Sequence, residues 1–408
     1  MLEILDFFKK HGFNNHIIFQ AKLNSYAHGL TADSGERLSV LSYHTDGQRE
    51  VAYDRHSMLG RLDQALNDSC YQNQNIMKIH TLISSFFCFF LALPCLAYDG
   101  PIIDGHAHWG DSFNEEAVLE RYSKMGVVAQ IVMPRYLGVK ADQPTTDERV
   151  LEIASRHSNK VFVLAGMQRP DFTYMDWNAP DRQSQTILNE IDKKLEDKKV
   201  FGIGEVLVRH WAYANEGTFG RHAEIEKRFD TLFIRQIARI AVKHQVPMVI
   251  HMEGYPELVN DLNKVLGEMP KLKLVWAHGC GRSEAEVIRN LLVSHANLYC
   301  DLSNMTNTGG YGSGWPKAEG FTHKIEEAGV FHEPFKKLIL DFPNRFFVGM
   351  DVAHQSRWMM KNGNTFETRV KRTRELLSTL PAPVAKKLAY ENVIAVYNLP
   401  KISVLINN

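Results

Sequence analysis

The feature that most constrains the fold of this chain is a series of eight short apolar runs that begins near residue 100. The runs cover residues 101–108, 127–134, 161–167, 200–208, 247–252, 272–278, 297–303 and 345–351. Near-continuous apolar runs of this length are typical of parallel strands that are buried on both faces. Helical patterns lie between them, for example at Glu115–Lys124, Asp147–His157, Thr186–Glu196, Ala223–His244 and Glu284–Val293. Eight strands alternating with helices predict an α/β fold, a (β/α)₈ TIM barrel, with a doubly wound sheet as the alternative.

The segment 77–97 interrupts the otherwise ordinary globular composition. It begins with Met77-Lys78, continues as an apolar run and ends in small residues at Cys95-Leu96-Ala97. This order is typical of a secretory signal peptide, although here it lies inside the chain. We therefore expect three parts: an N-terminal extension over 1–76 that is an over-extended gene model if Met77 is the true start, a signal-peptide-like segment over 77–97, and the barrel over 98–408.

A signal peptide in this place predicts export to the periplasm or the medium. The alternatives are a membrane anchor, since the run is barely long enough to span a bilayer, and a buried apolar helix. Of the five cysteines, Cys280 and Cys300 remain after cleavage. In an exported protein they could form a disulfide, and two free buried thiols are the alternative.

The charge balance narrows the range of partners. The 408 residues carry a formal net charge of zero. There is no basic excess that would indicate binding to nucleic acid or to an anionic membrane surface. We expect a small-molecule substrate and no stable membrane partner, and a homo-oligomer is compatible with the sequence.

The first apolar run ends in a His-x-His pair, His106-Ala107-His108. Side chains of a strand alternate between its faces, so both imidazoles should point to one side. Two imidazoles at that spacing can hold one transition-metal ion. Two unrelated histidines near a strand end are the alternative for this pair alone.

The other strand ends extend this pattern. In a barrel of this kind, functional residues lie at the carboxyl ends of the strands. Glu205 lies on the fourth run, His251 and His278 end the fifth and sixth, and Asp351 ends the eighth. A lone strand-end histidine has no special meaning, but six metal-type residues on five of eight strands indicate a metal centre.

These motifs together resemble the amidohydrolase superfamily of metal-dependent hydrolases, and most closely its amidohydrolase-2 branch. The resemblance covers roughly residues 100–400. It is carried by Asp104-Gly105-His106-Ala107-His108, Val249-Ile250-His251, Ala277-His278-Gly279, Gly349-Met350-Asp351 and the C-terminal run from Tyr390 to Pro400. That branch also contains non-oxidative decarboxylases.

The resemblance implies a role for each residue. His106, His108 and His251 would bind a divalent metal as neutral imidazoles. Asp351 would bind the metal or its water and accept a proton, and His278 would bind a second metal or act as the catalytic imidazole. Histidine and carboxylate ligands suit zinc, which we expect, with manganese, iron or cobalt as alternatives.

Glu205 decides whether one or two ions are bound. Many binuclear relatives carry a carboxylated lysine or a glutamate at the end of strand four, where it bridges two metals. Here Gly204-Glu205-Val206 offers a glutamate and no lysine. A bridging role is therefore expected, and the alternative is that Glu205 holds a ligand histidine from behind.

Three further residues are candidates for contacts with the substrate. Arg282 follows His278 by four residues, and Arg209 follows the fourth run. Guanidinium groups bind carboxylates or phosphates through two points, so an anionic substrate is one expectation, although rim arginines also form structural ion pairs. Trp109 could line the pocket or only cap the core. The other strand-end arginines are Arg135, Arg169 and Arg357, and the other aromatic candidates are Tyr136, Trp211, Tyr255 and Trp315.

The leading functional hypothesis is a metal-dependent hydrolase that uses metal-activated water on an ester, lactone, amide or phosphoester bond. The second is a metal-dependent non-oxidative decarboxylase of the same branch. The third is a non-catalytic metal-binding or ligand-binding barrel, because a fold does not prove an activity.

Overall fold

The computed structural model describes residues 38–44, 47–53, 98–109, 114–134, 146–169, 175–210, 225–303, 305, 325–352, 365–400 and 402. The chain divides into two compact units, Met1–Pro94 and Cys95–Asn408. In the first unit, β1 (Leu38–His44) and β2 (Gly47–Tyr53) form an antiparallel hairpin. The signal-peptide-like segment 77–97 lies outside the described residues. No helix within the described ranges is long and apolar enough to cross a membrane.

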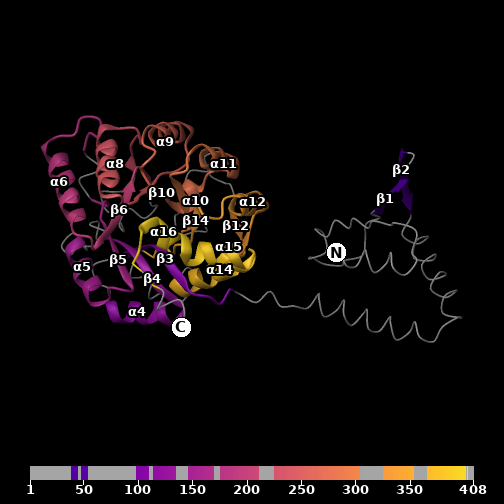
Figure 1. The fold of residues 1–408 in the computed structure, drawn as a ribbon, viewed down its shortest axis with the longest axis horizontal. Helices are drawn as coiled ribbons and strands as arrows, with labels where there is room; N and C mark the ends of the chain where they lie inside the picture. Colours follow the sequence, from indigo (N-terminus) through magenta and orange to yellow (C-terminus); the bar gives the residue numbers. More distant parts are fainter. Residues whose placement is uncertain are drawn as a thin grey trace. The chain divides into compact units, whose positions relative to one another are not determined.

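The second unit is a (β/α)₈ barrel, as predicted (Figure 1). Its strands are β3 (Ile102–Trp109), β4 (Val127–Pro134), β5 (Val161–Ala165), β6 (Val200–Leu207), β9 (Met248–His251), β10 (Leu274–Trp276), β11 (Leu298–Asp301) and β14 (Phe346–Phe347). They pair in parallel in this order along the chain. Each strand coincides with one of the eight apolar runs.

The two edge strands of this sheet meet and close the barrel. The amide of Gly105 in β3 donates to the carbonyl of Val348, at 2.9 Å, and the amide of Asp351 donates to the carbonyl of His106, at 2.7 Å. A Cβ on Gly105 would lie 2.8 Å from the carbonyl oxygen of Val348. The glycine of the Asp-Gly-His motif is therefore required because β3 approaches the backbone after β14 so closely.

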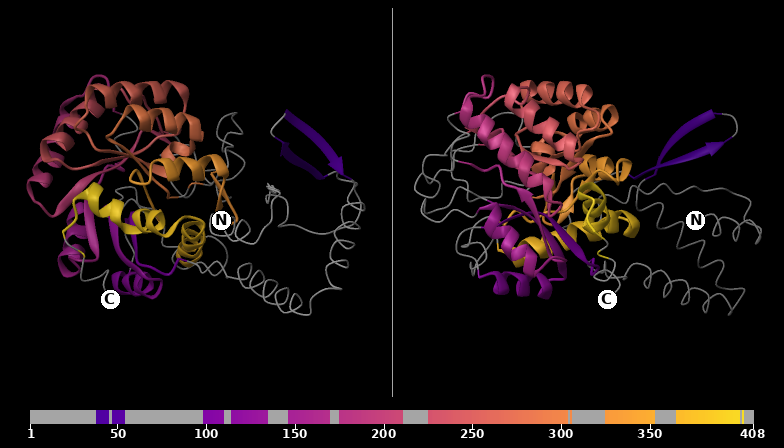
Figure 2. Two further views of the ribbon diagram at one scale, coloured as in Figure 1. Left: turned by 45° about the vertical axis from the view of Figure 1, so that its right-hand side comes forward. Right: turned by 60° about the vertical axis from the view of Figure 1, so that its left-hand side comes forward.

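Helices surround the strands (Figures 1 and 2). They are α4 (Glu115–Lys124), α5 (Asp147–Arg156), α6 (Arg182–Glu196), α8 (Leu232–His244), α9 (Pro256–Glu268), α11 (Ala285–Ser294), α12 (Glu333–Asp341), α14 (Phe366–Ser378), α15 (Ala382–Lys386) and α16 (Asn392–Tyr397), with a π-helical turn η3 (Lys387–Glu391) between the last two. Their apolar faces and the strands together form one continuous buried core.

Two helices begin at places that differ from the prediction, and capping explains both. The helix expected over 223–244 begins only at Leu232, because the Thr231 side chain accepts from the amide of Ile234. Residues before it form the short strand β8 (Ile225–Glu226), paired with β7 (Arg209–His210). The helix expected from Thr186 begins at Arg182, where Asp181 and Ser184 form a capping box.

The sixth predicted strand ends earlier than expected. Strand β10 stops at Trp276, and the element α10 (Ala277–Arg282) follows it. From His278 to Arg282 every residue has a positive φ, between 55° and 65°, so this element is a left-handed turn. L residues rarely adopt this conformation, and Gly279 and Gly281 at alternate positions reduce its cost.

The C-terminal helices hold the end of the sheet through side-chain and backbone contacts. The amide of Val348 donates to the carbonyl of Leu388, at 3.0 Å. The buried side chain of Asn392 donates to the carbonyls of Phe346, at 2.6 Å, and Pro343, at 2.8 Å. These bonds hold the strand that leads to Asp351.

Candidate metal centre

The six predicted metal residues lie together at the carboxyl end of the barrel. His106 and His108 come from β3, Glu205 from β6, His251 from β9, His278 from the left-handed turn after β10, and Asp351 from the segment after β14. All six are buried, and Asp351 is the most exposed of them, at 9%. The barrel topology therefore brings together residues from its first and last strands, which are distant in sequence.

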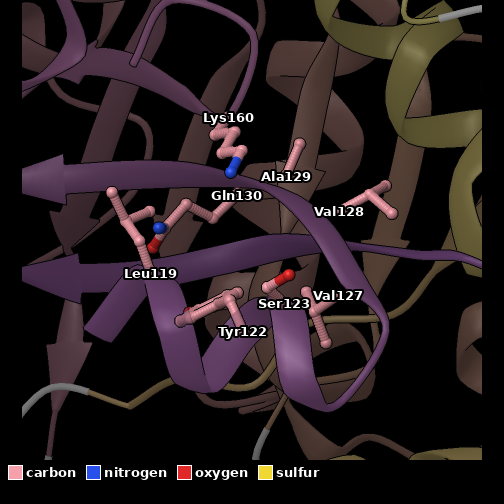
Figure 3. Close-up of a pocket in the computed structure, with 8 residues that line it drawn as sticks. All are labelled: Leu119, Tyr122, Ser123, Val127, Val128, Ala129, Gln130 and Lys160. Atoms are coloured by element: carbon pink, nitrogen blue, oxygen red, sulfur yellow. The ribbon is translucent and has the colours of Figure 1, made fainter. Parts of the chain in front are cut away.

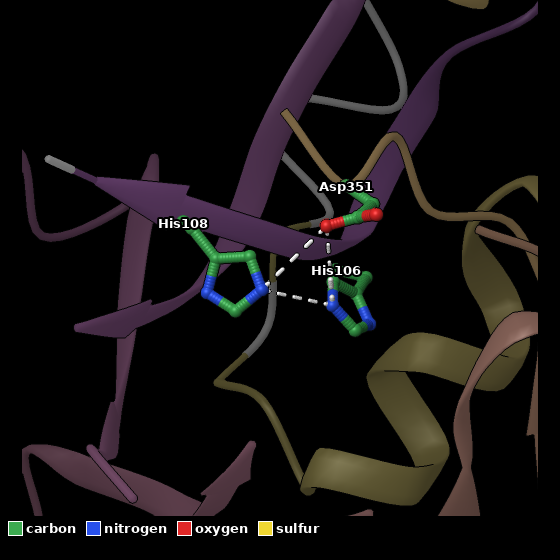
Figure 4. Close-up of side chains that lie close together, drawn as sticks. All are labelled: His106, His108 and Asp351. Carbon is green, nitrogen blue, oxygen red and sulfur yellow. Dashed lines mark hydrogen bonds and ion pairs between the residues drawn. The ribbon is translucent and has the colours of Figure 1, made fainter. Parts of the chain in front are cut away.

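One cluster consists of His106, His108 and Asp351 (Figure 4). The two Nε2 atoms are 3.1 Å apart. Oδ1 of Asp351 lies 3.8 Å from Nε2 of His106 and 3.6 Å from Nε2 of His108. Two imidazole nitrogens and one carboxylate oxygen, all of which can bind a metal ion, thus lie close together.

A second cluster contains His278, which contacts His251. One ligand atom each of His278, Glu205 and His106 also lie within 4.8 Å of one another. Nε2 of His278 lies 2.8 Å from Nδ1 of His251. The structure therefore groups His251 with His278, whereas the resemblance assigned it to the same ion as His106 and His108.

Glu205 lies between the two clusters and directs one oxygen to each. Its Oε2 is 3.4 Å from Nε2 of His108 and 3.8 Å from Nε2 of His106. Its Oε1 is 3.2 Å from Nδ1 of His251 and 3.3 Å from Nε2 of His278. The side-chain amide of Gln168 donates to Oε2 at 2.7 Å and fixes the carboxylate plane. A carboxylate in this position can bridge two ions.

Each of the four histidines of the centre has one ring nitrogen that points away from the other ligands, and this outer nitrogen faces an acceptor. Nδ1 of His106 bonds to Oδ2 of Asp301 at 2.9 Å, and Nδ1 of His108 to the carbonyl of Met133 at 3.0 Å. Nδ1 of His278 bonds to the carbonyl of Ser303 at 3.1 Å, and Nε2 of His251 to Glu253 at 3.3 Å. These acceptors place the ring proton on the outer nitrogen, so that in a neutral ring the inner nitrogen presents a lone pair.

The donor set fits divalent cations. Four inward lone pairs and the carboxylates of Glu205 and Asp351 would repel one another without a positive charge between them. A proton or a cation must occupy this space, and imidazole with carboxylate is a ligand set that zinc and related divalent metals prefer. His106, His108, Asp351 and one oxygen of Glu205 would hold one ion, and His251, His278 and the other oxygen would hold a second.

The pKa shifts reflect the same accumulation of acceptors. Although burial acts to lower it, the charges of Asp301 and Glu205 raise the pKa of His106 to about 10. Burial also acts to lower the pKa of His251, but hydrogen bonds to Glu205 and Glu253 raise it to about 9. Burial would raise the pKa of Glu205, yet the charge on His106 and the bonds from the other histidines hold it well below its usual range. The centre therefore favours positive charge beside ionised carboxylates.

The predicted substrate residues take part in contacts within the protein. Arg282 is buried and donates to Glu253 at 2.6 Å. Arg209 pairs with Glu226 at 3.2 Å, and its guanidinium lies over the ring of Tyr255. Trp109 is buried and donates to Gln130 at 2.8 Å. Arg169 pairs with Glu190 at 2.8 Å, and the remaining candidates, Arg135, Tyr136, Trp211, Trp315 and Arg357, lie outside the described residues.

Four residues behind the ligands were not singled out from the sequence: Gln168, Glu253, Asp301 and Ser303. Asp301 and Ser303 end the seventh predicted strand, and Glu253 follows His251 by two residues. A rule that examines every strand end for polar residues would have found Asp301. Nothing in the sequence links Gln168 to Glu205, because their contact depends on the pairing of β5 with β6.

A small cavity of about 170 Å³ lies away from this centre, between α4 and β4 (Figure 3). Its lining includes Leu119 and Ser123 of α4, Gln130 of β4 and Lys160 before β5. None of the six predicted metal residues lines it.

Comparison with known proteins finds one family model and several solved structures that are similar to this chain. The family model described as TatD related DNase matches residues 103–301. The comparison with curated proteins finds no match. Among solved structures, an amidohydrolase from Burkholderia multivorans is 13% identical, with 74% of this chain and 100% of that chain covered and a TM-score of 0.43.

Two further solved structures are of other kinds. A dihydroxybenzoic acid decarboxylase from Polaromonas sp., with bound manganese and an inhibitor, is 10% identical. The match covers 74% of this chain and 99% of that chain, with a TM-score of 0.44. Dihydroorotase from Campylobacter jejuni is 14% identical. The match covers 74% of this chain and 84% of that chain, with a TM-score of 0.44.

Proposed function

We propose that this protein is a hydrolase of the amidohydrolase type that depends on two divalent metal ions. The observation that carries the proposal is the position of Glu205, whose two oxygens face two separate histidine pairs. A glutamate that only held a ligand histidine from behind would contact an outer ring nitrogen. The outer nitrogens here face Asp301, Met133, Ser303 and Glu253 instead.

The ions, when bound, would lower the pKa of a water molecule toward neutrality and polarise the scissile oxygen of the substrate. The protein groups would orient and exchange protons around them. Asp351 is the proposed general base, because its carboxylate lies beside the inner nitrogens of His106 and His108 and it is the most exposed of the six. Without metal, the charge on His106 holds the pKa of Asp351 below its usual range, against the effect of burial. Zinc is the proposed metal, with manganese, iron or cobalt as alternatives, because each accepts nitrogen and oxygen ligands.

The proposed substrate is a small molecule with an ester, lactone, amide or phosphoester bond. Arg282 and Arg209 lie on either side of His251 in the sequence, and both already contact carboxylates. An anionic substrate could therefore bind these two arginines only by displacing the carboxylates of Glu253 and Glu226 from them. We further propose that the protein is exported, which the disulfide between Cys280 and Cys300 supports because disulfides persist in oxidising compartments.

The test is a substrate panel with the full chain loaded with zinc or manganese. The panel contains an aryl ester, a lactone, an amide and a phosphodiester, together with a hydroxybenzoate whose decarboxylation is followed by release of carbon dioxide. We expect hydrolysis of at least one bond class, lost on chelation and restored by the metal. Asp351→Asn should lower kcat by about 10²–10⁴-fold, whereas Asp341→Asn, an exposed carboxylate on α12, should not.

Two results would contradict the proposal. Release of carbon dioxide without hydrolysis would identify the decarboxylase alternative. Absence of turnover in every class, with both ions bound, would favour the non-catalytic barrel.

A further inference from the structure

The left-handed turn α10 contains two residues that position the second cluster, His278 and Arg282. At its start, His278 directs Nε2 toward His251 and Glu205. At its end, Arg282 donates to Glu253, and Glu253 in turn holds Nε2 of His251 at 3.3 Å. One five-residue segment therefore positions His278 directly and His251 through an ion pair.

This turn has a conformation that its own residues disfavour. His278, Cys280 and Arg282 are L residues with φ of 61°, 56° and 55°. Isolated residues visit this region, but consecutive ones require support from their surroundings. The turn must therefore be held by contacts outside itself.

A disulfide at the centre of the turn provides such a contact. Cys280 is bonded to Cys300 of β11, with their Cα atoms 5.0 Å apart. The residue after Cys300 is Asp301, whose Oδ1 accepts from the amide of His278 at 3.2 Å. Both cysteines are fully buried. Strand β11 is itself fixed by pairing with β10 and β14, so it can serve as the anchor.

The first cluster is held mainly by elements other than this turn, although Asp301 contacts both the amide of His278 and the ring of His106. His106 and His108 lie in β3, which pairs with β4, and Asp351 is held by the backbone of His106. Asp301 contacts His106, but it belongs to the anchored strand and not to the turn.

We propose that Cys280 and Cys300 are positioning residues for the His251–His278 half of the centre, so that reduction of their disulfide releases the second ion and leaves the first. The inference rests on the proposed two-ion function. Reduction breaks one S–S bond and forms two thiols, which takes two electrons and two protons. A water-soluble phosphine supplies the electrons and becomes the phosphine oxide, and one water molecule supplies the oxygen and both protons.

The experiment measures metal per chain in the full-length protein loaded with zinc and freed of excess metal. A phosphine reductant is used rather than a dithiol, because thiolates bind zinc themselves. We expect two ions per chain in the oxidised protein, one after reduction, and two again after reoxidation in the presence of zinc. Far-ultraviolet circular dichroism should stay unchanged throughout, which a general loosening of the fold would not allow.

The matched control is the double variant Cys280→Ala with Cys300→Ala, which should hold one ion and should not respond to the phosphine. If this variant does not fold, reduction and reoxidation of the natural chain still decide the matter. Two ions per chain in both redox states, with two free thiols counted per chain after reduction, would overturn this inference and leave the proposed function intact. Loss of both ions together on reduction would also overturn it, and a single ion in the oxidised protein would overturn both proposals.

Discussion

Oε2 of Glu205 lies 3.4 Å from Nε2 of His108, while the other oxygen of the same carboxylate faces a different pair of histidines. Glu205 also groups with His106 and His278, since one ligand atom of each of the three lies within 4.8 Å of the others. We propose that this carboxylate joins the sites of two ions, and the metal stoichiometry of the protein should follow from it.

Removal of one histidine from the second cluster should remove one ion only. His278→Ala deletes the Nε2 that lies beside His251, so the second ion loses one of its three protein ligands. We expect metal content to fall from about two ions per chain to about one, measured by elemental mass spectrometry. His295→Ala is the control, since His295 bonds to Asn263 outside the centre and should leave both ions in place.

Metal binding should release protons and weaken as the pH falls. The pKa values of His106, about 10, and His251, about 9, are raised above the ordinary value, so without metal both rings carry a second proton at pH 7. An ion must displace these protons, and apparent affinity should rise by about tenfold per pH unit for each displaced proton, up to pH 9–10. Calorimetry at pH 7 in two buffers of different ionisation enthalpy measures the release, and equal heats in both would contradict it.

Glu253 should control the affinity of the second ion without touching it. Glu253→Gln replaces the carboxylate that holds Nε2 of His251 and leaves the buried Arg282 without its charged partner. We expect affinity for the second ion to fall by about 10–100-fold and stability to fall by about 3–5 kcal/mol. The exposed Glu257 in the first turn of α9 gives the control Glu257→Gln, which should change neither the titration curve nor the denaturant midpoint.

Tyr122 should matter for stability and not for metal binding. Its hydroxyl donates at 2.6 Å to the buried Asp104, whose pKa is raised by burial to about 6. Asp104 also accepts from the amides of His106 and Met350 and so ties β3 to the segment after β14. Tyr122→Phe should cost about 1.5–3 kcal/mol in urea unfolding, whereas a change in metal content would place Asp104 in the centre itself.

The sequence predicts the barrel well because its signals are local. Each strand is a continuous apolar run, and the carboxyl ends of parallel strands meet at one end of a barrel, so His106, His251 and Asp351 could be grouped by their positions in the chain alone. The groups behind them could not, since the contact of Gln168 with Glu205 depends on register between neighbouring strands. The left-handed turn is a further case: glycines at alternate positions permit it, but nothing local in the sequence indicates that His278 and Cys280 also take a positive φ.

The start of helix α8 shows a smaller limit of the same kind. Apolar periodicity continued back to Ala223, but Thr231 caps the helix at its start, and residues before it pair with β7. Apolar periodicity alone does not show where a helix begins. The first backbone N–H groups can be satisfied either by a capping side chain or by a further turn of helix.

The most direct test of the two-ion centre is the metal content of the natural chain and of Glu205→Gln, loaded with zinc and freed of excess metal. An amide presents only one oxygen as a ligand and carries no charge, so it cannot bridge two ions as a carboxylate does. We predict about two ions per chain for the natural protein and about one for the variant. One ion per chain in both proteins, with the same affinity, would contradict the bridge and with it the two-ion mechanism.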